Sequence, residues 1–236
     1  MKNSLFYICL FLLITSCNKD EKKIYESYDL EFFNHIKITD SFNTILHESD
    51  EFRIEIVAAE SRQKFIKFSV TDSILEIKND KIAGWSNPEI NDIELHIYSE
   101  PLSLVEVAES GFVSTANPIT SDEFGIVLQN KVNEADLELD CGTFYFWNNE
   151  PSGGKLTLSG QCGVTKIWNH ALMSVDAKSL VTDAALVENR SKGNIEISPT
   201  QRLEYSILDV GDIHLYSIPV EIIGMDNTGE GSLIQF

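Results

Sequence analysis

The sequence predicts an all-β protein, a solenoid of the β-helix type that follows an amino-terminal section of alternating strands. The first observation is a repeat from about residue 125 to residue 236, in which short β-type runs end on Asn or Asp. The second is their spacing of 18, 21, 20, 20 and 18 residues, because such a period with two strands per unit is typical of a solenoid. The third is apolar–polar alternation between residues 36 and 101, which indicates strands with one buried face. The Asn and Asp ends are Asn130, Asn148, Asn169, Asn189, Asp209 and Asn227.

Residues 1–16 form a predicted lipoprotein signal peptide. Lys2 supplies positive charge, and an apolar run of ten over residues 5–14 is too short to cross a bilayer but fits a signal peptide. The segment Ile14-Thr-Ser-Cys17 resembles the lipobox of bacterial lipoproteins, which implies cleavage before Cys17 and lipidation of its thiol. Several acyl chains on one residue anchor a protein durably in a membrane. The alternative is an ordinary secretory signal with an incidental cysteine.

Residues 17–35 are expected to be the lipidated cysteine and a polar tether. The tether begins with the charged run Asn18-Lys-Asp-Glu-Lys-Lys23. A lysine and two acidic residues behind the anchor resemble the signal that exports Bacteroidetes lipoproteins to the outer face of the outer membrane. On that resemblance we expect an outer-membrane lipoprotein, with the cell-surface face favoured over the periplasmic one.

The amino-terminal section is predicted to consist of strands joined by turns, with one helical turn over residues 58–64. Each strand places apolar side chains on one face and polar side chains on the other, as expected of a half-buried sheet. The alternating runs are Ile36–Ile38, Phe52–Val57, Phe65–Val70, Ile74–Lys78 and Ile93–Ile97.

The predicted β-helix explains which residue types recur in the repeat. Equivalent residues of successive coils in a β-helix stack about 4.8 Å apart, so an Asn column can form a ladder in which each amide both donates and accepts. Val, Ile, Leu and Phe at alternating positions are expected to fill the interior. Glycines at 111, 154, 193, 211 and 231 suit corners where φ is positive or backbones come close.

The repeat also pairs two cysteines and two tryptophans. Cys141 and Cys162 occupy matching positions 21 residues apart, within the distance range of a disulfide. Parallel stacked side chains suit the disulfide torsion poorly, so a bond and two buried thiols both remain open. The same register stacks Trp147 on Trp168, either as a ligand platform or as a packed column.

The net charge and the residue composition limit the classes of binding partner and of chemistry that we expect. The formal charge is −19, from 18 Lys and Arg against 37 Asp and Glu, and this repels nucleic acid and anionic headgroups. The five histidines show no metal-ligand spacing, and no nucleophile elbow or phosphate loop occurs. We therefore expect no catalytic residues, no metal and no cofactor.

The order of these segments resembles a known family. Residues 93–97 lead into Pro101-Leu-Ser-Leu-Val-Glu-Val-Ala-Glu-Ser-Gly111, then into the ladder of short strands, and then into Gly211-Asp-Ile-His-Leu-Tyr216. This arrangement resembles the putative auto-transporter adhesin, head GIN domain family of Bacteroidetes envelope lipoproteins. The resemblance implies a right-handed parallel β-helix over residues 36–236, and it brings no catalytic residues.

Two functions follow as hypotheses. The first is a non-catalytic cell-envelope lipoprotein, held to the membrane by its lipid anchor, whose solenoid surface serves adhesion or binds an envelope protein or a glycan. The second is a carbohydrate-binding or polysaccharide-lyase-like β-helix protein. Clustering of charged and aromatic side chains on one outer face near Trp147 and Trp168 would favour the second.

Overall fold

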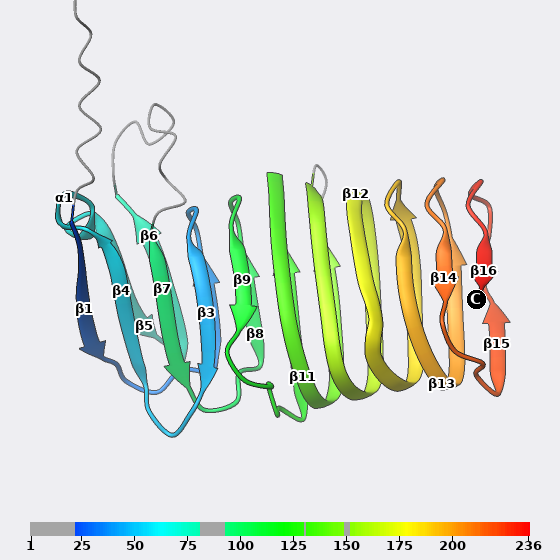
Figure 1. Ribbon diagram of the computed structural model, residues 1–236, viewed down its shortest axis with the longest axis horizontal. Coiled ribbons are helices and arrows are strands. Elements are labelled where there is room, and N and C mark those ends of the chain that lie inside the picture. The colour runs from blue at the N-terminus through cyan, green and yellow to red at the C-terminus, as the bar shows by residue number, and fades with distance from the viewer. Residues whose placement is uncertain (1–21, 81–92, 130, 149–151) are drawn as a thin grey trace, which may run out of the picture.

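The computed structural model describes residues 22–80, 93–129, 131–148 and 152–236 (Figure 1). These residues form one sixteen-stranded sheet and one four-residue helix. In chain order the elements are β1 (Lys23–Asp29), β2 (His35–Ile38), β3 (Asn43–Glu48), β4 (Arg53–Ala59), α1 (Glu60–Gln63), β5 (Ile66–Thr71), β6 (Ile74–Asn79), β7 (Glu94–Ser99), β8 (Leu104–Val107), β9 (Phe112–Thr115), β10 (Glu123–Leu128), β11 (Lys131–Asn148), β12 (Ser152–Ser191), β13 (Ile195–Ile207), β14 (Ile213–Leu215), β15 (Glu221–Gly224) and β16 (Leu233–Gln235).

The strands wind into a β-solenoid of about 6 turns, which confirms the predicted architecture. Strands β8, β10, β11, β12, β13 and β15 are joined by parallel pairing, and the paired positions lie about twenty residues apart in the chain. Phe146, for example, pairs with Ile126 on one side and with Ile167 on the other. Figure 1 shows these coils stacked along the long axis, with the carboxy terminus at one end.

The amino-terminal section continues the same stack and closes its first end. Strand β2 pairs in parallel with β8, and β3 pairs in parallel with β7 and β9. Beyond them the pairing becomes antiparallel, with β4 between β1 and β7 and with β5 against β6. The helix α1 confirms the predicted helical turn and follows β4 directly.

The predicted tether over residues 17–35 is wrong from Lys23 onward. Strand β1 pairs antiparallel with β4 over its full length, and Phe33 is completely buried. Sequence patterning missed β1 because it is an edge strand, whose residues face solvent on most positions and so lack a hydrophobic period. The ordered sheet therefore begins at Lys23, only six positions after Cys17.

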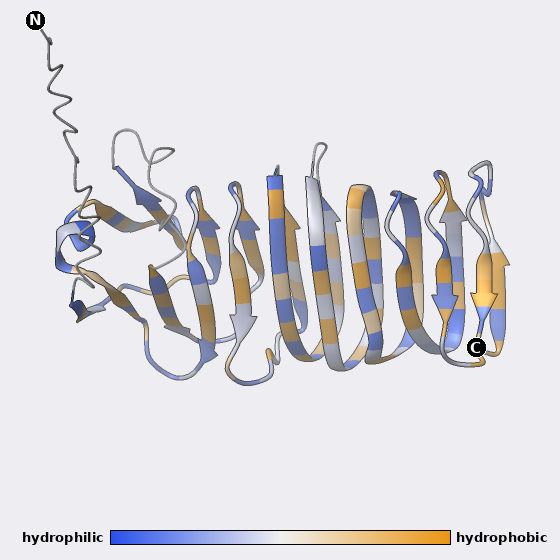
Figure 2. Ribbon diagram, turned by 45° about the horizontal axis from the view of Figure 1, so that its top comes forward, coloured by the Kyte–Doolittle hydropathy of each residue, from blue (hydrophilic) through white to orange (hydrophobic). Residues whose placement is uncertain are grey.

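One continuous core runs through the solenoid. Buried and exposed residues alternate along β11, and Figure 2 shows hydrophobic and hydrophilic residues alternating along the strands. The interior holds large apolar residues such as Phe124 and Phe144, which are fully buried with ring centroids 6.1 Å apart. Because each coil covers only its neighbours, burial of these side chains depends on stacking.

The predicted Asn and Asp column is shorter than the repeat implied. Asn148, Asn169 and Asn189 are fully buried, and Asn169 Nδ2 donates to Asn189 Oδ1 at 3.3 Å. On the flanking coils the equivalent positions are Leu128, which pairs with Asn148, and Ile207, which pairs with Asn189. Asp209 therefore lies outside the column, whereas Asn227 Oδ1 accepts a hydrogen bond from the backbone N–H of Ile207 at 3.0 Å. Asn130 lies outside the described residues. The coils differ slightly in length, so equal spacing along the chain did not guarantee equal position in space.

Candidate functional site

Trp147 and Trp168 lie side by side on an outer wall of the solenoid. Their strands pair in register at these two positions, as the repeat predicts. Both side chains face outward from the core and are 38% and 37% exposed. A large aromatic residue that stays this exposed on a regular sheet does not serve core packing.

Tyr145 extends this aromatic surface and is seated by a glycine. Tyr145 pairs with Gly125, and a Cβ atom built on that glycine would lie 2.0 Å from Tyr145 Cζ. The tyrosine ring therefore lies over the backbone of the preceding coil, in the space that a Cβ atom on Gly125 would fill. We call Tyr145, Trp147 and Trp168 the aromatic platform.

Charged residues surround the aromatic platform. Lys166 pairs with Tyr145 inside it, and Glu106 lies on the amino-terminal side, two coils from Trp147 through Val127. Glu188 lies beside Trp168, because Asn169 and Asn189 are bonded and each is preceded by one of these residues. Burial, together with the negative charges of Glu123 and Glu106, raises the pKa of Tyr145 above its ordinary value, so its hydroxyl stays protonated and able to donate.

The structure brings Cys141 and Cys162 together as two thiols. The residues pair in register, both are buried, and their Sγ atoms are 2.6 Å apart. Hydrogen bonding to Cys162 and burial raise the pKa of Cys141, whereas the bond from Cys141 lowers that of Cys162. Either thiol can donate the hydrogen bond between them. The disulfide stays a prediction.

A histidine cluster on β3 and β7 was missed by sequence analysis. His47 Nε2 and His96 Nδ1 are 3.0 Å apart, and His96 Nε2 lies 2.9 Å from a Glu94 carboxylate oxygen. The His47 ring stacks on Tyr98 at 4.3 Å, and the Arg53 guanidinium lies 3.9 Å from the centre of the same tyrosine ring. His47 and His96 are 49 residues apart in the chain, so only the pairing of β3 with β7 brings them together.

This cluster predicts a pH dependence of stability. Burial, followed by the nearby His96 and Arg53, lowers the pKa of His47. Between the folded-state pKa and about 6.5 the unfolded chain therefore binds more protons, so stability is full above about pH 6.5 and decreases as the pH falls through the folded-state value. We expect the Tm of the native chain to fall more between about pH 7.5 and pH 5.5 than that of the His47→Gln variant. Equal slopes in the two thermal-unfolding series would contradict the assignment.

The remaining charges on the solenoid walls are largely paired with one another. The Nζ atoms of Lys155 and Lys178 each lie 3.0 Å from Oδ2 of Asp176, and Nζ of Lys178 also lies 2.7 Å from Oε2 of Glu196. Glu196 and Asp176 raise the pKa of Lys178. Lys155, Asp176 and Glu196 line a depression of about 350 Å³, together with Lys192. These ion pairs join successive coils of the solenoid.

Cys17, the predicted lipidation site, lies outside the described residues. Within the part of the chain that the structure describes, no helix is both long and apolar enough to cross a membrane. Nor do three or more His, Cys, Asp or Glu side chains of those residues gather in an arrangement that suits a metal ion.

The protein is a β-solenoid with one continuous hydrophobic core, and its outer walls carry the aromatic platform and the ion pairs described above. The chain belongs to the family described as putative auto-transporter adhesin, head GIN domain, whose model matches residues 32–219. This confirms the predicted resemblance. Membership suggests a protein of the cell envelope or surface that is not an enzyme.

Solved structures share the fold at low sequence identity. A putative adhesin from Bacteroides fragilis has a TM-score of 0.84 at 20% identity, over 92% of this chain and 98% of its own. A putative adhesin from Parabacteroides merdae has a TM-score of 0.62 at 17% identity, over 92% and 97%. A protein from Parabacteroides distasonis described as a putative lipid binding protein has a TM-score of 0.63 at 16% identity, over 92% and 98%. No curated protein matches the sequence.

Proposed function

We propose that this chain is a non-catalytic lipoprotein of the outer membrane, displayed at the cell surface, whose solenoid wall serves adhesion. The observation that carries the proposal is the aromatic platform, with Trp147 and Trp168 in register and exposed on an otherwise regular wall. Membership in the adhesin family supports the same function. The partner is an envelope protein or a glycan, because a net charge of −19 disfavours nucleic acid.

The anchor we propose is a lipidated Cys17. Six positions separate it from the first residue of β1, so the intervening chain spans at most about 20 Å when fully extended. Strand β1 lies at the end of the solenoid opposite the carboxy terminus (Figure 1). An anchor at Cys17 would therefore hold the amino-terminal end near the membrane, with the coils beyond it.

Replacement of the anchor tests this function. In cells that express the full chain, the Cys17→Ser variant should lose incorporation of a labelled fatty acid and leave the membrane fraction, while Cys141→Ser should keep both properties. Protease added to intact cells should digest the native chain if it is displayed on the surface. Unchanged membrane attachment of Cys17→Ser would refute the anchor, and complete protection from protease would refute surface display.

A carbohydrate-binding function is the second candidate, and a specific observation favours it over a polysaccharide lyase. Charged and aromatic side chains do cluster around Trp147 and Trp168, as a sugar-binding wall requires. A lyase would need an unpaired basic group beside an acidic substrate. Four basic side chains of the walls instead have a nitrogen atom within 4 Å of a carboxylate oxygen, namely Lys155, Lys178, Arg190 and Arg202.

We also propose that Cys141 and Cys162 form a disulfide in the oxidising cell envelope, because their register already places the two sulfur atoms together. A count of free thiols in the unfolded chain, isolated without reductant, decides between the bond and two buried thiols. Both residues unreactive before reduction and both reactive after it is the expected result. Two reactive thiols without reduction would refute the bond.

A further inference from the structure

We infer that the aromatic platform binds an uncharged glycan, with the sugar rings laid against Tyr145, Trp147 and Trp168. The inference deepens the proposed function, on which it rests, by naming the site and the class of ligand. It follows from the shape of the wall and from the charges on the platform and around it.

The shape suits flat rings that follow one another. Trp147 and Trp168 occupy adjacent paired strands, so their attachment points are separated by about 4.8 Å along the solenoid axis. Their exposed rings and the ring of Tyr145, which lies over Gly125, face outward from the same wall of the sheet. Pyranose rings present a face of C–H groups that packs on aromatic rings, while their hydroxyls remain free for hydrogen bonds at the edges.

The edges supply those hydrogen bonds. The carboxylates of Glu106 and Glu188 are 25% and 29% exposed on the two sides of the platform. Gln129 donates to Glu106 at 3.2 Å and Arg190 donates to Glu188 at 2.6 Å, so each carboxylate is held in place. A carboxylate has about four acceptor positions, which leaves acceptors for sugar hydroxyls.

The charges exclude the other ligand classes. Glu106 and Glu123, whose negative charges act on Tyr145, repel uronic acids, sialylated glycans and phosphates, whereas the charge of Glu188 is paired with Arg190. Lys166 lies inside the platform beside Tyr145, and this positive charge opposes a basic peptide, which the aromatic rings would otherwise attract. A ligand that tolerates both signs and favours aromatic faces is a neutral polyhydroxyl chain.

Binding should be measured with the purified full chain in mild detergent against soluble neutral polysaccharides. A mannan, a β-glucan and a galactan serve as neutral probes, polygalacturonate as the anionic probe and polylysine as the cationic probe. Affinity electrophoresis gives the dissociation constant, and tryptophan fluorescence reports contact, because the chain holds only 3 tryptophans. We expect at least one neutral polymer to bind with a blue shift, and Trp147→Ala and Trp168→Ala each to weaken it by roughly tenfold or more.

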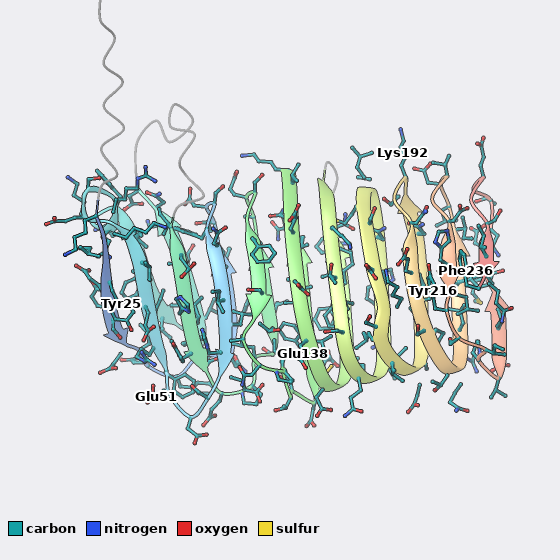
Figure 3. All side chains as sticks on the ribbon, viewed as in Figure 1. Tyr25, Glu51, Glu138, Lys192, Tyr216 and Phe236 are labelled. Carbon is teal, nitrogen blue, oxygen red and sulfur yellow. The ribbon has the colours of Figure 1, made fainter. Side chains whose placement is uncertain are left out.

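Two exposed aromatic residues elsewhere serve as matched controls. Tyr25 is 58% exposed near the amino-terminal end, and Tyr216 is 40% exposed near the other end, where it stacks on Phe236 (Figure 3). Tyr25→Ala and Tyr216→Ala should leave the affinity unchanged. Circular dichroism of each variant confirms that the fold is intact.

Several results would overturn the inference. They are the absence of binding to every neutral polymer, stronger binding to polygalacturonate or polylysine, or a loss of binding in Tyr216→Ala that the tryptophan variants do not show. The proposed function is judged separately, by fatty-acid labelling and protease accessibility. A displayed lipoprotein that ignores neutral glycans would therefore refute this inference alone.

Discussion

Gly154→Ala should destabilise the protein by at least about 3 kcal/mol, which for a chain of this size lowers Tm by roughly 6 °C or more. Gly154 has a φ of +116°, a conformation that residues with a Cβ atom rarely adopt. The added Cβ would also lie 1.9 Å from the carbonyl oxygen of Asn133 on the preceding coil. Because that oxygen belongs to the backbone of a paired strand, it can move away only if the two coils separate.

The neighbouring glycine provides the control. A Cβ on Gly153 would meet Leu172 at ordinary contact distances, 3.4 Å from its Cβ and 3.9 Å from its carbonyl oxygen, and the φ of Gly153 is not in the strained range. Gly153→Ala should therefore change the free energy of unfolding by less than about 1 kcal/mol. Urea unfolding of both variants measures the difference, and similar costs would show that the coils do not pack as closely as described.

Asn148→Ala should cost about 2–4 kcal/mol. Asn148 is fully buried, its Nδ2 donates to the carbonyl oxygen of His170 at 2.9 Å, and its Oδ1 accepts from the backbone N–H of His170 at 2.7 Å. The side-chain amide thus bonds both backbone groups of a residue at the bend of the next coil. Alanine would leave both groups without these partners and would also open a cavity.

Asn117 provides a comparison for this prediction. It makes the same two bonds to the backbone of Glu48, both at 3.0 Å, but it is only partly buried. Water can replace the lost partners at such a site, so Asn117→Ala should cost less than Asn148→Ala. If the two variants lose equal stability in urea unfolding, burial of the asparagine column is not what makes it stabilising.

The asparagine column also shows how far a sequence repeat reaches. The recurring Asn predicted a column of stacked residues, and the structure shows that Asn148, Asn169 and Asn189 of this column are fully buried. The prediction failed at Asp209, because β13 places Ile207 opposite Asn189. A difference of two residues in the length of one coil is invisible when spacings are only approximately equal.

The candidate site likewise contains residues whose contacts the sequence predicted and residues whose contacts only the structure revealed. Trp147, Trp168 and the two cysteines were predictable, because matching positions of consecutive coils of similar length must become neighbours. The contact between His47 and His96 was not predictable from the sequence. Strands β3 and β7 are separated in the chain by β4, β5 and β6, which include antiparallel pairs and follow no repeat. Glu188 lies next to the aromatic platform on the following coil, and only the register within β12 places it there.

The sequence by itself determined the period, the alternation of buried and exposed side chains, and the family, since each depends on the order of residues along short segments. Tertiary structure decided where the solenoid begins, which coils share an asparagine, and which charges border Tyr145, Trp147 and Trp168. The physical reason is that strand pairing joins residues about twenty positions apart. A change of one or two residues in a turn therefore alters the neighbours on every outer face without altering the local pattern.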